Sequence, residues 1–145
     1  MSEKTVEWLA ILIFFFVFFA LTLGEAGWLN KKGGASLNKA FAFSFASNIF
    51  TVVVGFSLSF VVFAAVLALA FGGAFEGLSG NDWRLWAAVI AGALFPLVLS
   101  ALAKRLGLRI FKLHPVLSPW AFSFIASIIF VALVAAAPTL FIYFT

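Results

Sequence analysis

One carboxylate inside an apolar run is the clearest candidate for chemistry in this chain. Glu25 is the only ionisable residue between Trp8 and Leu29. A carboxylate within a membrane is costly unless it is paired, and such residues typically mark a proton or cation route or a substrate contact. A second interpretation is interfacial, because Trp28 is typical of a membrane boundary and lies about one helical turn away. Glu25 would then contact lipid headgroups or pair with the basic residues that follow, which are Lys31, Lys32 and Lys39.

Polar and small residues recur at helical spacing in the next apolar run. They are separated by three or four positions and therefore share one face of a helix, at about 100° per residue: Ser44, Asn48, Thr51, Gly55 and Ser59. Such a face is typical of close helix packing with interhelical hydrogen bonds, and alternatively of a lined cavity or pathway. Two serines of the last apolar run are expected at a similar depth. The candidate ligand or ion pathway therefore consists of Glu25, Ser44, Asn48, Thr51, Ser123 and Ser127.

Basic residues follow the third apolar run at helical spacing. Arg105, Arg109 and Lys112 would share one face of a short amphipathic turn lying in the membrane interface, where they would meet anionic lipid headgroups. Gly107 weakens a helix at this point, so the alternative is an ordinary positively charged loop. Membrane lipids are the binding partners that this segment predicts.

The composition identifies the solvent in which these residues must work. The chain has 145 residues, of which 66% are hydrophobic and 10% charged, whereas soluble domains have roughly a quarter charged residues. A soluble fold of this length would expose large apolar areas to water. The formal net charge is +4, but the charged residues lie mostly in the segments between apolar runs. They therefore do not indicate nucleic-acid binding.

The apolar runs predict an all-α integral membrane protein with a single domain of four transmembrane helices. The expected spans are 8–29, 41–72, 85–103 and 120–143, each long enough to cross at about 20 residues per crossing. We expect the first run to be retained rather than cleaved, because it exceeds a signal-peptide core of about 7–15 residues. The second run is longer than one crossing requires and is expected to form one long, tilted helix.

The basic residues predict an orientation. Seven of the nine Lys and Arg residues fall in the first and third loops, and only Lys4 and Arg84 fall on the other side. The seven are Lys31, Lys32, Lys39, Lys104, Arg105, Arg109 and Lys112. Because cytoplasmic loops carry the excess of basic residues, both termini are expected to be extracytoplasmic. A bacterial inner membrane suits this pattern.

Two similar segments suggest an internal repeat. Residues 42–50 and 121–130 both begin Ala-Phe-Ser-Phe and match further after one insertion. Both are expected at the cytoplasmic start of an even-numbered span, as in two hairpins related by an axis along the membrane normal. A chance match in a sequence this rich in Phe, Ala and Ser is the alternative.

No constellation in the sequence predicts catalysis. The sequence has no cysteine and one histidine, and it lacks the motifs of metalloproteases, serine hydrolases and P-loop enzymes. We therefore expect neither an enzyme nor a metal or cofactor site. Two functional classes are open: a non-catalytic subunit that packs into or anchors a larger membrane complex, and a small homo-oligomeric transporter or channel that uses Glu25 near the cytoplasmic side.

Overall fold

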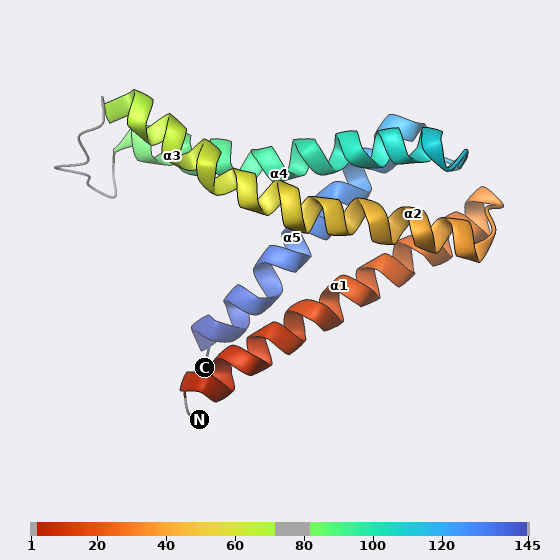
Figure 1. The fold of residues 1–145 in the computed structure, drawn as a ribbon, viewed down its shortest axis with the longest axis horizontal. Helices are drawn as coiled ribbons and strands as arrows, with labels where there is room; N and C mark the ends of the chain where they lie inside the picture. Colours follow the sequence, from red (N-terminus) through yellow and green to blue (C-terminus); the bar gives the residue numbers. More distant parts are fainter. Residues whose placement is uncertain (1–2, 72–81, 145) are drawn as a thin grey trace.

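The expected all-helical fold, with four helices long and apolar enough to span a membrane, is confirmed. The computed structural model describes residues 3–71 and 82–144, which form helices and short connections with no strand in those ranges (Figure 1). Four helical stretches are long and apolar enough to cross a membrane: Lys4–Gly33, Leu37–Ala70, Trp83–Ile110 and Pro119–Phe144. The individual elements are α1 (Glu3–Gly33), α2 (Leu37–Phe50), the π-helix η1 (Thr51–Phe56), α3 (Ser57–Phe71), α4 (Trp83–Ile110) and α5 (Pro119–Phe144).

The second apolar run is one continuous helical path, as expected for a single long span. The sequence did not predict the π-helix η1 in its middle. At this point Gly55 faces Pro96 of α4, and a Cβ on the glycine would lie 3.4 Å from the proline Cα. The helices therefore approach closely where both carry compact residues. Residue 72, the last of the expected second span, lies outside the described residues, as do residues 73–81 of the expected connection to the third span.

Local signals fix where two of the helices begin. The Ser36 hydroxyl caps α2 by accepting a hydrogen bond from the Lys39 backbone N–H at 3.4 Å, and Asp82 caps α4 through the Arg84 backbone N–H at 2.9 Å. Such caps satisfy N–H groups that have no partner within the helix. The side-chain hydrogen bond from Arg84 also lowers the pKa of the Asp82 carboxyl. The two side chains are partly exposed, at 38% for Arg84 and 14% for Asp82, so the contribution of this ion pair to stability is modest.

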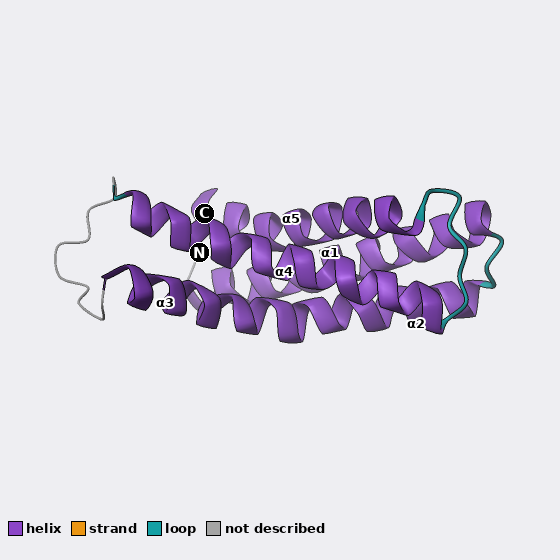
Figure 2. Ribbon diagram, turned by 90° about the horizontal axis from the view of Figure 1, so that it is seen from above, coloured by secondary structure: helices purple, strands orange, loops and turns teal. Residues whose placement is uncertain are grey.

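Helices α1 and α5 form one pair, and α3 and α4 form another. The two pairs meet at one end of the molecule. Helix α1 packs against α2 and α5, while α4 packs against α2, η1, α3 and α5. Figure 1 shows α1 and α5 diverging from α3 and α4 toward the chain termini, and Figure 2 shows the α1–α2 and α4–α5 connections together at the opposite end. The best-packed part of the bundle is therefore the half nearest those two connections.

Two apolar clusters lie within this half. One surrounds Phe43 near the short connections, and the other surrounds Phe130 toward the middle of the bundle. The Phe130 ring stands edge-on to Phe18 of α1, with ring centroids 5.8 Å apart. Polar side chains from three helices occupy the space between the clusters, and they form the candidate site.

The third spanning helix extends beyond the expected span. The expected span ends at residue 103, but α4 continues to Ile110 and includes Lys104, Arg105 and Arg109. The interpretation of Lys104 as a loop cation is wrong, since its side chain is 0% exposed. Burial is possible because the ammonium meets a carboxylate and two further oxygen acceptors inside the bundle. Six basic residues, rather than seven, therefore remain at this end: Lys31, Lys32, Lys39, Arg105, Arg109 and Lys112.

Candidate functional site

A buried ammonium group is the centre of the polar cluster. Lys104 Nζ of α4 lies 2.9 Å from Glu25 Oε1 and 2.6 Å from Oε2, which belong to α1. The same nitrogen contacts Asn48 Oδ1 of α2 at 2.6 Å and, more distantly, Ser47 Oγ at 3.4 Å. An ammonium has three donors and no acceptor. These oxygens therefore satisfy it completely, and one cation joins α1, α2 and α4.

Hydrogen bonds extend the cluster along α1 and α2. Asn48 donates from Nδ2 to the Thr22 hydroxyl at 3.1 Å, and Thr22 in turn donates to the Phe18 carbonyl at 2.8 Å. Thr22 and Glu25 are three residues apart, so they face the same direction on α1. The Asn48 amide thus uses its carbonyl for Lys104 and its amino group for Thr22, which fixes its orientation.

Two aromatic rings flank the ammonium of this cluster. Lys104 Nζ lies 5.9 Å from the centre of the Phe43 ring and 5.6 Å from that of Phe130, within the range of cation–π attraction. Phe130 belongs to α5, so the fourth spanning helix also contacts the ammonium. The Glu25 side chain is 8% exposed. Removing one member of such a pair leaves an uncompensated buried charge.

The structure brings only part of the predicted pathway together. Glu25 and Asn48 meet at Lys104. Thr51 is the first residue of η1, and its hydroxyl donates to the Ser47 carbonyl at 2.9 Å. Ser123 donates to the Pro119 carbonyl within α5 at 2.7 Å. The hydroxyls of Ser44 and Ser127 are buried and have no partner among the described residues. These residues are inward-facing, but they do not form one continuous polar line.

The predicted pairing of Glu25 with the basic residues that follow it in sequence is wrong. The carboxylate pairs with Lys104 rather than with Lys31, Lys32 or Lys39. Lys104, Thr22 and Ser47 are the members of the cluster that are absent from the predicted pathway. A signal for Lys104 exists, because the residues buried on α4 include a series at steps of four: Ala88, Gly92, Pro96, Ser100, Lys104 and Leu108. Ala88, Gly92, Pro96 and Ser100 share one helix face at steps of four, and Lys104 is the next position on that face.

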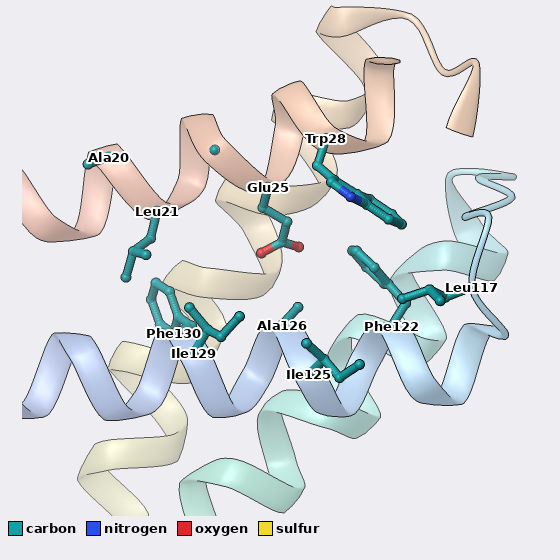
Figure 3. A pocket seen from close by; sticks show the side chains of 11 residues that line it. Ala20, Leu21, Glu25, Trp28, Leu117, Phe122, Ile125, Ala126, Ile129 and Phe130 are labelled. Carbon is teal, nitrogen blue, oxygen red and sulfur yellow. The ribbon is translucent and has the colours of Figure 1, made fainter. Parts of the chain in front are cut away.

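A pocket of about 330 Å³ between α1 and α5 reaches the other side of Glu25. Figure 3 shows the carboxylate at this pocket, with Leu21 and Trp28 on its own helix and Phe122, Ala126 and Phe130 on α5. The remaining lining is apolar. Glu25 therefore joins the buried ion pair to a pocket that lies between two spanning helices.

A second pocket gathers the basic residues that were predicted to meet lipid headgroups. Arg105, Arg109, Lys112 and His114 line a space of about 440 Å³ near the α4–α5 connection. The Arg105 guanidinium lies over the Trp120 ring, 5.6 Å from its centre. Arg105 and Arg109 belong to the last turns of α4, and Lys112 follows the helix end. The expected cluster exists, although most of it is helical rather than part of a loop.

Within the described ranges, no group of three His, Cys, Asp or Glu side chains is placed to hold a metal ion. Comparisons with protein-family models, curated proteins and solved structures found no match for this chain. The features of this chain that bear on function are therefore the buried ion pair, the pocket beside Glu25 and the basic pocket at the end of α4.

Proposed function

We propose that this chain is a non-catalytic membrane subunit that packs against other membrane proteins, and the one-sided packing of α3 carries this proposal. Within the chain, α3 packs mainly against α4 and η1. Leu67 is the one buried residue among its described side chains. In lipid, helices associate through close packing and hydrogen bonds rather than by the hydrophobic effect. The side of α3 that faces away from α4 is therefore available to a partner.

The exposed side of α3 carries residues that suit a partner helix. Ala64 and Ala68 are both exposed and four residues apart, so they lie on one face. Small residues at this spacing let a second helix approach closely. The buried polar cluster supports the same role, because Glu25 and Lys104 neutralise each other and hold the bundle together without a partner. A bundle that is joined by a buried ion pair in one half and exposes one side of α3 in the other suits a subunit.

Partner association should depend on this α3 face. We expect mild-detergent extraction and affinity purification to recover stoichiometric membrane partners with the wild-type chain, and Ala68→Leu to reduce their recovery severalfold by blocking close approach. Ala135→Leu is the matched control, because Ala135 is an exposed alanine on α5. Mass spectrometry of the purified material measures partner recovery for the wild type, Ala68→Leu and Ala135→Leu. Recovery of a pure homo-oligomer from the wild type would contradict the subunit role and favour the transporter alternative.

The transporter alternative rests on the pocket beside Glu25. A path through the bundle would need polar groups at all depths, and a homo-oligomer would have to supply them. The pairing of Glu25 with Lys104 leaves little net charge for coupling to ion movement. The subunit role therefore has the better support.

We further propose that both termini are extracytoplasmic in a bacterial inner membrane. Six basic residues lie near the α1–α2 and α4–α5 connections, and Lys4 and Arg84 lie near the other end. The excess predicts a cytoplasmic location for these connections. The repeat proposal is also supported, because Phe43 and Ser44 are buried in α2 and the matching Phe122 and Ser123 are buried in α5.

Reporter fusions should distinguish the two orientations. Alkaline phosphatase, which is active only outside the cytoplasm, is expected to be active when fused after the last residue and inactive when inserted between Lys32 and Leu37. The reason is the difference of six basic residues against two. Colony colour and enzyme assay measure the outcome. An inactive C-terminal fusion that is expressed at normal levels would overturn the orientation.

A further inference from the structure

The basic pocket at the end of α4 has the properties of an anion site. Arg105, Arg109 and Lys112 line it together with His114, and the first three make no ion pair with an acidic residue in the described ranges. The Arg105 Nε atom is buried and has no hydrogen-bond partner among those residues. An unpaired buried donor is unfavourable. The pocket therefore has an excess of positive charge.

The start of α5 adds to this positive field. Pro119 begins α5 and lines the same pocket, so the positive end of the dipole of a 26-residue helix points toward it. The Trp120 ring packs against the Arg105 guanidinium and restricts its orientation. Planar guanidinium groups held in this way suit the oxygens of a phosphate.

Lys112 enters the pocket from an unfavourable backbone conformation. It has φ of +52° and is the one non-glycine residue with positive φ in the described ranges. It follows the end of α4, where the Leu113 N–H donates to the Leu108 carbonyl at 2.9 Å. Glycine is the usual residue at such a helix end, because a side chain is disfavoured there. Lysine at this position therefore supplies a charge at a conformational cost.

We propose that this pocket binds the phosphate of an anionic lipid headgroup. The lipid source follows from the surroundings, because the exposed side chains of Leu106, Ile110 and Trp120 flank the basic residues. A tryptophan beside basic residues is typical of the membrane interface. Basic pockets between spanning helices bind phosphate-bearing headgroups in this way. The inference does not depend on the proposed subunit role, since lipid binding is a property of the isolated chain.

Native mass spectrometry of the full-length protein in detergent tests the site. With added phosphatidylglycerol we expect one tightly bound lipid, preferred over phosphatidylcholine, and about fivefold weaker binding after Arg109→Gln. The matched control is Lys31→Gln, which removes an exposed positive charge at the same end but outside the pocket and should leave binding unchanged. Equal losses in the two variants would show a diffuse surface effect and overturn the site. Complete displacement by millimolar inorganic phosphate would overturn the lipid assignment.

Lys112→Gly separates binding from folding. Because glycine tolerates positive φ, this variant should unfold a few degrees higher than the wild type while binding phosphatidylglycerol about fivefold more weakly. A purely structural role for Lys112 predicts no loss of binding. A variant that is more stable and binds the lipid as tightly as the wild type would therefore exclude Lys112 from the site.

Discussion

Lys104→Met is expected to lower the free energy of unfolding by about 3–5 kcal/mol, because it leaves the buried Glu25 carboxylate without its counter-charge. Through its Nζ atom, Lys104 of α4 bonds to Glu25 of α1 and to Asn48 of α2. Methionine fills a similar volume, so the loss would come from the missing charge and hydrogen bonds. Titration with sodium dodecyl sulfate in mixed micelles, followed by circular dichroism, measures the change.

A double variant makes this expectation specific to the ion pair. Replacing Glu25 as well, in Lys104→Met/Glu25→Gln, removes the isolated charge and should recover most of the lost stability, since neutral replacements of a buried pair are often tolerated. Lys31→Met is the surface control and should change stability by no more than about 0.5 kcal/mol. The single variant Glu25→Gln completes the comparison. If the double variant loses as much stability as Lys104→Met and Glu25→Gln lose in sum, the pair is not the source of the effect.

The sequence was sufficient for the spanning helices but not for the pairing between them. Apolar length alone predicts four spans, because each must cross the hydrocarbon core with its backbone bonded internally. The spacing of Ser44, Asn48 and Thr51 likewise predicts an inward face, and all three are buried. Which helix lies opposite this face depends on the approach of α1 and α4, and the spacing within one helix does not contain that information.

Lys104 shows why a local rule failed. A lysine at the end of an apolar run is ordinarily a boundary marker, since an isolated charge is costly in the membrane. The rule does not apply when a carboxylate on another helix offers compensation 79 residues away in the chain. The same reason explains why Glu25 pairs with Lys104 and not with the basic residues nearest to it in sequence. Depth and helix face together, rather than distance along the chain, decide which charges meet.

Gly107→Ala is expected to destabilise the protein by roughly 1–2 kcal/mol, even though alanine favours a helix by about 1 kcal/mol over glycine. A Cβ at this position would lie 2.8 Å from Phe43 Cε2 and 2.9 Å from Cδ2. The Phe43 ring has little freedom to move, because it is fully buried and packs against Phe111 and Phe122. The expected clash therefore exceeds the gain in helix propensity.

Gly27→Ala provides a control with the opposite sign. A Cβ on Gly27 would meet nothing within 4 Å, so this substitution should stabilise α1 by up to about 1 kcal/mol through helix propensity alone. Both variants make the same chemical change and can be compared in the same detergent titration. Because Phe43 also contacts Lys104, displacement of its ring by Gly107→Ala should loosen the polar cluster as well. A stabilising effect of Gly107→Ala equal to that of Gly27→Ala would show that the α2–α4 contact is less tightly packed than these distances require.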